Sequence, residues 1–155
     1  MGLSVTDRMV CPQMALPDHI EPPEPSADVV ALTAANAHET VALSDLAFPG
    51  FFRPRTYRMG SYYGVRAPSG ELIAMGGERL KLDGYSEIST VCTHPSFRGK
   101  GFAESIIWQV VRQHRREGVL SFLHVGKANT RAIALYQRLG FVIRGEITIT
   151  RMVAF

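Results

Sequence analysis

The segment Arg98-Gly99-Lys100-Gly101-Phe102-Ala103 places two glycines at the start of a long helical pattern. Glycine lets backbone N–H groups turn toward a ligand, and its missing side chain allows that ligand to come close. The first turn of a helix adds unpaired N–H donors and a partial positive charge, which together favour an anion. Arg98 and Lys100 contribute further positive charge at the rim. The segment therefore predicts a site for a phosphate or diphosphate group.

Two other phosphate-binding motifs do not fit this segment. A Walker A loop needs glycine where His94 stands and serine or threonine where Gly101 stands. The dinucleotide-binding fingerprint needs a third glycine at the position of Glu104. It also needs an acidic residue after the next strand, where the sequence has His124 and Lys127. Residue types at these positions exclude both alternatives.

The two cysteines, Cys11 and Cys92, form neither a CxxC motif nor a framework of several bridges, so we expect reduced thiols. Cys92 and His94 are metal-type ligands, but nothing nearby completes a set of four, so we expect no metal. Cys92 as an acyl-carrying nucleophile would need more than a Cys-x-His spacing. No stretch reaches the ~18 apolar residues of a membrane span, and residues 1–10 do not resemble a signal peptide. These features predict a cytoplasmic protein without a membrane partner.

The 155 residues are 46% hydrophobic and 20% charged, which is typical of one globular domain. Arg112, Arg115 and Arg116 crowd one helix end, but Glu117 follows them and no aromatic residues interleave. We therefore expect a solvated basic face and no nucleic-acid partner. The net charge of +3 is mild and suits a polyanionic cofactor.

The elements that must position the phosphate segment follow from periodicity and turn residues. Residues 1–27 form a proline-rich extension that offers one edge strand, and residues 28–155 form the main domain. Alternating or apolar runs predict strands over 28–32, 61–66, 71–82, 85–93, 119–125 and 141–155, the last broken near Gly145. Helical spacing predicts helices over 34–47, from Ala103 to a stop at Gly118, and from the Asn129 cap to Gly140. A short element over 51–60 is poorly defined.

The segment from Arg98 to Ala103 resembles the Arg/Gln-x-x-Gly-x-Gly/Ala signature of the GNAT superfamily of N-acetyltransferases. The preceding residues 87–95 look like the fourth strand of that family. Residues 129–141 resemble its second signature, a helix with the pattern Asn…Ala…Tyr…Gly-Phe. The branch most resembled is the glycine-N-acyltransferase-like one, and the resemblance covers about residues 61–145. Two signatures in the right order and spacing are specific.

This resemblance implies an α/β GNAT fold. Its mixed, largely antiparallel, twisted sheet would have six or seven strands with helices on both faces, and would be splayed between the fourth and fifth strands. Acetyl-CoA would lie in the splay as cosubstrate, its pantetheine paired with backbone groups of the fourth strand. The cofactor-binding residues that the resemblance implies are Val91, Cys92, Thr93, Arg98, Gly99, Lys100, Gly101, Phe102, Ala103, Asn129, Ala132 and Tyr136.

Tyr136 stands at the general-acid position of the family. A phenol with an ordinary pKa of ~10 can protonate the leaving CoA thiolate. The alternative is that Tyr136 only packs on the apolar face of its helix. Asn129 caps that helix and could also touch pantetheine.

Glu87 on the fourth strand is the preferred general base, acting through water. A regular strand would place Glu87, Ser89, Val91 and Thr93 on one face. The alternative is a carboxylate paired with an arginine. Two further candidates are Glu78 on the neighbouring strand, which is weaker, and His124, whose alternative is a hydrogen-bonded core histidine.

The resemblance puts the acceptor under the loop after the first helix. There Phe51, Phe52, Arg53 and Tyr57 could hold an apolar body and a carboxylate, or could be core aromatics and a solvated arginine. We expect acetyl or small-acyl transfer to a primary amine of a small molecule or peptide by direct attack. The alternatives are a non-catalytic CoA-binding regulatory module and an interaction protein with the same fold. Strand edges in the N-terminal segment and the final strand would allow a homodimer.

Overall fold

The computed structural model describes residues 2–155, which form two compact units. One unit contains residues 2–20 and Phe122–Phe155, and the other contains Glu21–Ser121. We call them the terminal unit and the central unit.

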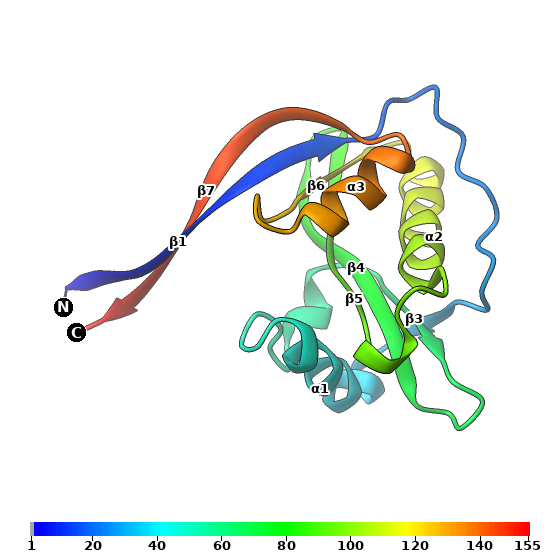
Figure 1. Ribbon diagram of the computed structural model, residues 1–155, viewed down its shortest axis with the longest axis horizontal. Coiled ribbons are helices and arrows are strands. Elements are labelled where there is room, and N and C mark those ends of the chain that lie inside the picture. Colours follow the sequence, from blue (N-terminus) through cyan, green and yellow to red (C-terminus); the bar gives the residue numbers. More distant parts are fainter. Residues whose placement is uncertain (1) are drawn as a thin grey trace. The chain divides into compact units, whose positions relative to one another are not determined.

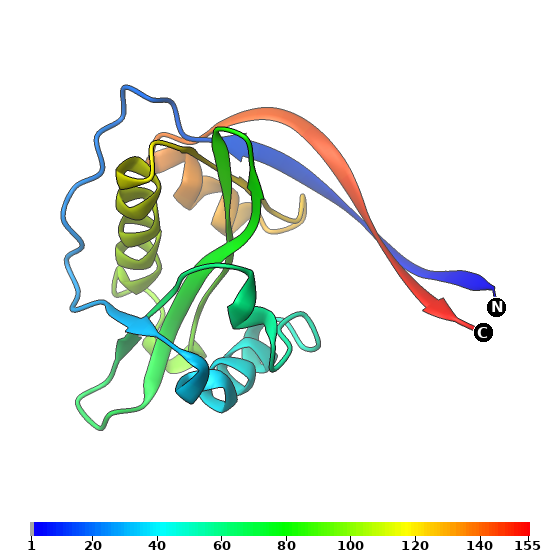
Figure 2. The ribbon, with the colours of Figure 1, turned by 180° about the vertical axis from the view of Figure 1, so that it is seen from behind.

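The central unit is an antiparallel meander with helices packed on it (Figure 2). Its strands are β2 (Val30–Leu32), β3 (Tyr62–Arg66), β4 (Leu72–Leu82) and β5 (Tyr85–Thr93), and each pairs with the next. Gly70 and Gly84 have φ values of 90° and 74°, so the predicted turns at both positions use the left-handed region that glycine favours. The meander is therefore built as its sequence predicts.

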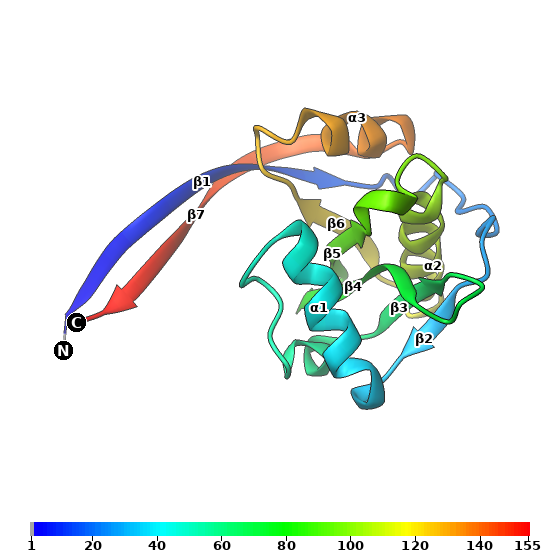
Figure 3. The same ribbon diagram turned by 60° about the horizontal axis from the view of Figure 1, so that its bottom comes forward.

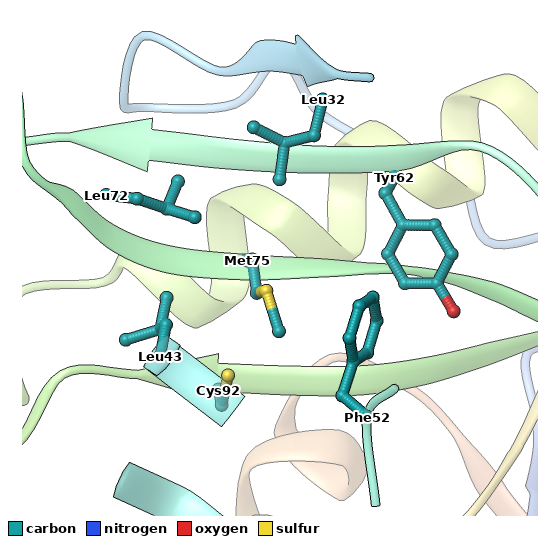
Figure 4. Close-up of a cluster of buried hydrophobic side chains, with 7 residues drawn as sticks. All are labelled: Leu32, Leu43, Phe52, Tyr62, Leu72, Met75 and Cys92. Carbon is teal, nitrogen blue, oxygen red and sulfur yellow. The ribbon is translucent and has the colours of Figure 1, made fainter. Parts of the chain in front are cut away.

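The helices of the central unit lie on both faces of this meander (Figure 3). They are α1 (Ala37–Ala47) and α2 (Phe102–Arg116), with short 3-10 turns η1 (Ala34–Asn36), η2 (Thr56–Met59) and η3 (Pro95–Phe97). The predicted cap Thr33 accepts a hydrogen bond from the Ala35 amide at 3.3 Å and so begins η1 instead of α1. The core on the α1 face comprises Leu32, Leu43, Phe52, Tyr62, Leu72, Met75 and Cys92 (Figure 4), and that on the α2 face Val65, Ala67, Ile73, Ala74 and Ile106.

The terminal unit is built around two long paired strands. β1 (Leu3–Ala15) pairs antiparallel with β7 (Val142–Ala154), and its residues Gln13–Ala15 also pair with β6 (Leu120–His124). The helix α3 (Thr130–Arg138) connects β6 to β7. The ends of β1 and β7 extend away from β6 and α3 as a two-stranded arm (Figure 1). We call residues 3–10 and 148–155 the arm.

The sheet has seven strands in the order β2-β3-β4-β5-β6-β1-β7. β6 begins in the central unit, where the Leu120 amide donates to the Gly84 carbonyl at 2.9 Å. The predicted α/β class, mixed sheet and strand count are confirmed. One prediction is wrong: the N-terminal strand lies between β6 and β7 and is not an edge strand. The predicted break near Gly145 is a bulge, because Gln13 pairs with Gly145 and Met14 with Ile143.

Candidate functional site

The predicted phosphate-binding turn connects β5 to α2. The His94 amide donates to the Ile73 carbonyl at 2.7 Å and holds the end of β5 against β4. Gly99 and Gly101 then take φ values of 79° and 78°, and Gly101 is the residue that begins α2. No side chain caps this helix start, and no heavy atom within 4 Å opposes a Cβ built on either glycine. The turn is therefore open at the helix start.

Basic side chains border this turn as the sequence predicts. Arg98 and Lys100 are exposed, and the Lys100 ammonium lies 5.3 Å from the centre of the Phe97 ring. The His94 ring accepts a hydrogen bond from the Ser96 amide through Nδ1 at 3.2 Å. Open backbone amides beside two cations are chemically suited to a diphosphate.

The strand β5 is irregular where the predicted cofactor pairing lies. Met75 pairs with Cys92 and Gly77 with Ser89, so β5 contains one extra residue between Ser89 and Cys92. Thr90 has a φ of 57°, which a β-branched residue rarely adopts. We call this irregularity the Thr90 bulge.

The Thr90 bulge changes which side chains share a face. Cys92 joins the core on the α1 face, whereas Val91 lies beside Gly76 on the α2 face. The expectation that Glu87, Ser89, Val91 and Thr93 share one face is wrong, because a bulge shifts the alternation by one residue. Residues 91–93 keep half-buried or buried side chains, and their pairing with a cofactor stays a prediction.

Glu87 forms a close ion pair across the β4–β5 hairpin. Its side chain is 1% exposed, and Arg79 donates to its two carboxylate oxygens at 2.6 and 3.0 Å. This is the arginine-paired alternative. The guanidinium occupies both carboxylate oxygens, so a water or an amine would have to share them with Arg79. The base role of Glu87 stays a prediction.

Glu78, the weaker base candidate, belongs to a buried network that the sequence did not predict. His114 contacts its Oε1 at 3.0 Å, Ser86 donates to Oε1 at 3.0 Å, and the Ser61 amide donates to Oε2 at 2.7 Å. Burial opposes ionisation, yet these hydrogen bonds lower the pKa of Glu78 to about 2. His114 also contacts Ser121 at 2.8 Å. The network connects α2 to the meander through His114, a residue of α2.

The predicted second-signature residues lie in the terminal unit. Asn129 caps α3 by accepting the Ala132 amide at 3.2 Å, as predicted. Tyr136 is buried and packs edge-on against Phe141, with ring centres 5.8 Å apart. Burial raises the pKa of Tyr136 to about 12, so the phenol is protonated at neutral pH. That state suits a proton donor, and the acid role stays a prediction.

His124 and Cys92 have defined surroundings. His124 Nε2 lies 3.0 Å from the Gln13 side-chain nitrogen, and its ring packs edge-on against Phe122. This contact corresponds to the hydrogen-bonded alternative for His124. Burial raises the pKa of the Cys92 thiol to about 12, which disfavours a nucleophilic thiolate. In the part of the chain that the structure describes, no three His, Cys, Asp or Glu side chains group as a metal site.

The predicted acceptor residues are divided between core and surface. Phe52 is fully buried and packs edge-on against Tyr62 at 5.3 Å (Figure 4), so its predicted substrate contact is replaced by a core position. Tyr57 packs against the same core. Phe51 and Arg53 are exposed, and they remain the predicted acceptor contacts. Within residues 2–155, no helix is both long and apolar enough to cross a membrane.

Comparison with known proteins now identifies the family. Residues 62–149 match the family described as FR47-like protein. An acetyltransferase of the GNAT family from Novosphingobium aromaticivorans is 35% identical over 97% of this chain and 67% of its own, with a TM-score of 0.83. The chain therefore belongs to the GNAT family of acetyltransferases, and the predicted superfamily is confirmed. No curated protein matches the chain.

More distant structures share the fold. A GNAT-family acetyltransferase from Colwellia psychrerythraea is 16% identical over 94% of this chain and 57% of its own, with a TM-score of 0.77. An acyl-CoA N-acyltransferase from Klebsiella pneumoniae is 22% identical over 82% of this chain and 99% of its own, with a TM-score of 0.62. The chain thus spans between about half and two thirds of the length of several relatives, and nearly all of another.

Proposed function

We propose that this protein transfers an acetyl or small acyl group from acetyl-CoA to a primary amine of a small molecule or peptide. The observation that carries the proposal is the open turn at the start of α2, where Gly99 and Gly101 leave backbone amides uncovered beside Arg98 and Lys100. This turn is the place of the family signature. The CoA diphosphate would bind there because backbone donors and a helix start favour an anion.

The reaction is a direct attack. The amine nitrogen forms a bond to the thioester carbonyl carbon, the carbon–sulfur bond breaks, and the amine loses a proton. Tyr136 donates a proton to the departing thiolate and is reprotonated from solvent. The buried thiol of Cys92 supports direct transfer over a covalent enzyme intermediate, because its raised pKa leaves almost no thiolate at neutral pH. The role of Tyr136 rests on the family signature and on its protonated state.

Two measurements test the proposal. Isothermal titration with CoA and acetyl-CoA should give saturable binding, and release of free thiol should require an amine from a panel of amino acids, polyamines, aminoglycosides and peptide N-termini. Binding of CoA without thiol release for any amine would favour a non-catalytic CoA-binding module. The absence of heat with both compounds at millimolar concentration would contradict the proposal.

The glycine-N-acyltransferase-like branch is proposed from the sequence signatures, and a cytoplasmic setting from two free cysteines, both buried. A homodimer is proposed because the arm exposes apolar side chains and β7 ends the strand order. A second copy of this chain is the proposed partner, with no nucleic-acid or membrane partner.

A further inference from the structure

The segment that follows α1 carries the excess positive charge of the chain. We call residues 46–59 the basic loop; it contains Arg53, Arg55 and Arg58 and no acidic residue. The chain has 17 basic and 14 acidic residues, so without these three arginines the two kinds would balance. All three arginines are exposed, and none forms an ion pair within the described residues. Asp45, the nearest acidic residue in the sequence, accepts a backbone amide of the loop at 3.0 Å.

Large apolar side chains are exposed in the same loop. They are Leu46, Phe48, Phe51 and Met59. The Phe48 and Phe51 rings meet edge-on, with centres 6.4 Å apart. The Arg53 guanidinium reaches back toward Gly50, because a Cβ built on Gly50 would lie 3.8 Å from its Nη2 atom. Apolar rings and an unpaired cation therefore lie close together at this part of the surface.

The basic loop is anchored by residues that alternate with the exposed ones. Phe52 is fully buried, and Tyr57 packs against the same α1-face core. The Arg53 amide donates to the Thr56 hydroxyl at 2.9 Å, and η2 follows at once. A partner would therefore bind a surface whose backbone is already ordered, which lowers the entropic cost of binding.

Unpaired guanidinium groups beside exposed apolar side chains suit a partner that has carboxylates beside apolar side chains. Arginine binds carboxylates through charge-assisted hydrogen bonds, and its planar group also packs on aromatic rings. An exposed apolar patch rimmed by polar groups marks an interaction surface. Three guanidinium groups and four apolar side chains, spread over the whole basic loop, are more than one small amine contacts at once. The loop therefore fits an acidic polypeptide.

We propose that the basic loop docks an acidic polypeptide segment that also contains apolar residues, and that the acceptor amine belongs to this polypeptide and not to a small molecule. This inference rests on the proposed acyl transfer and narrows its acceptor. The transfer itself is unchanged: the polypeptide nitrogen bonds to the acyl carbon, the carbon–sulfur bond breaks, and the nitrogen loses one proton. Charge attracts the segment to the loop and selects against basic partners.

The first test compares three short peptides with the same free N-terminus. One contains Asp, Glu, Phe and Leu, the second has Asn and Gln in place of the acids, and the third has Ser in place of Phe and Leu. In thiol release we expect kcat/KM of the first to exceed that of each other peptide about tenfold. Its advantage over the second should shrink as salt rises from about 0.05 to 0.5 M. Equal values for the first peptide and either other one, or a preference for a small amine, would overturn the inference while leaving acyl transfer intact.

The second test compares Arg53→Gln/Arg58→Gln with Arg115→Gln/Arg116→Gln. The second pair removes the same charge from the last turn of α2, far along the chain from the basic loop, and is the matched control. We expect the first pair to raise KM for the acidic peptide about tenfold, with kcat, CoA affinity and thermal midpoint unchanged. The control pair should keep the KM of the natural protein. Equal increases of KM in both variants would indicate general charge attraction and overturn the docking surface.

Fluorescence anisotropy of the labelled acidic peptide measures docking without turnover. Vesicles of phosphatidylcholine and phosphatidylserine, and a single-stranded oligonucleotide, are the competing anions. If either binds through Arg53 and Arg58 while the acidic peptide binds no better than the neutral one, the surface belongs to a lipid or a nucleic acid and the inference is wrong. If no amine releases thiol but the peptide binds and the Arg53→Gln/Arg58→Gln variant loses it, acyl transfer and the acceptor assignment fail together, whereas the docking surface stands.

Discussion

Burial sets the protonation state of two groups that bear on acyl transfer: the Tyr136 phenol, the proposed acid, and the Cys92 thiol, a nucleophile that direct attack does not need. Tyr136 and Cys92 are both buried, and each has a pKa raised to about 12 by desolvation. For a phenol this keeps the donor form in place at every physiological pH, whereas for a thiol it removes the nucleophilic form. Burial therefore leaves Tyr136 in the protonated form that an acid requires, although the raised pKa makes it a weaker proton donor, and it disfavours Cys92 as an acyl carrier.

Replacing Tyr136 with phenylalanine should separate catalysis from binding. We expect kcat to fall by about 10²-fold, because general-acid catalysis contributes factors of this order, while CoA affinity stays unchanged. In the natural protein, kcat should not decline between about pH 8 and 10 through loss of the Tyr136 proton, since its pKa lies near 12. Steady-state kinetics and titration calorimetry check both points. An undiminished kcat would assign Tyr136 to packing alone.

Replacing Cys92 with alanine should not abolish acyl transfer. Because the thiol is buried and protonated, we expect iodoacetamide at neutral pH to label it slowly in the folded natural protein. The substitution removes one sulfur atom from the α1-face core, so the thermal midpoint should fall modestly. Labelling followed by mass spectrometry, with kinetics of the variant, tests this. Loss of turnover together with a trapped acyl group on Cys92 would contradict direct attack.

At the scale of elements, the two ends of α2 offer a matched pair of glycines. Gly101 begins the helix with a φ of 78°, and Gly118 follows its end with a φ of 72°. Neither has a neighbour within 4 Å of a built Cβ, so alanine at either position meets backbone strain and no collision. Each substitution should cost about 1 kcal/mol of unfolding free energy.

Only Gly101→Ala should also weaken CoA binding, because the backbone amides at that end would hold the diphosphate. Denaturant melts and CoA titrations of both variants check the expectation. Equal CoA affinities for Gly101→Ala and Gly118→Ala, at equal stability loss, would argue against the turn as the diphosphate site.

The buried network of Glu78 should make the fold sensitive to acid. Its pKa is lowered from 4.5 to about 2, so its contribution is complete above about pH 4.5 and is lost as pH falls toward 2. A pKa shift of this size corresponds to roughly 3 kcal/mol of unfolding free energy. In chemical denaturation at several pH values, Glu78→Gln should lose less unfolding free energy over that window than the natural protein. Glu71→Gln, at an exposed position in the β3–β4 turn, is the control. Parallel curves for Glu78→Gln and the natural protein would refute the role of the network.

The sequence predicts most elements because their signals are local. Turn glycines, the Asn129 cap and the apolar spacing of α2 each act within a few residues, so those predictions are confirmed. The Thr90 bulge has no local signal, since its extra residue is defined only by pairing with β4. The sequence leaves Phe52 open between an acceptor contact and a core aromatic, because nothing in its segment indicates the Tyr62 ring that it packs against. The structure at such residues is decided by contacts with residues distant in the sequence, and not by local secondary-structure propensity.

At the scale of the whole molecule, the most unusual feature is the arm of the terminal unit. The Lys127 amide still donates to the Val10 carbonyl at 2.9 Å, but residues 3–8 of β1 pair with β7 in the described part of the chain, and a two-stranded ribbon is marginally stable in water by itself. The register places Val5 opposite Met152 and Leu3 opposite Ala154, so these side chains share one face of the arm. Leu3 is 65% exposed, Val5 47% and Met152 53%. An apolar face on an isolated ribbon favours a covering partner.

A second copy of this chain would cover that face in a symmetric arrangement, with the same patch on both copies. The double variant Val5→Thr/Met152→Thr keeps strand-forming side chains but removes apolar surface, so it should shift the mass measured by light scattering from dimer toward monomer. Val153 is the matched control, because it is 48% exposed and adjacent in β7 but points to the opposite face of the ribbon. Val153→Thr should leave the dimer intact. A natural protein that stays monomeric up to about 100 μM, where weak dimers of micromolar affinity would be populated, would show that this face has another partner.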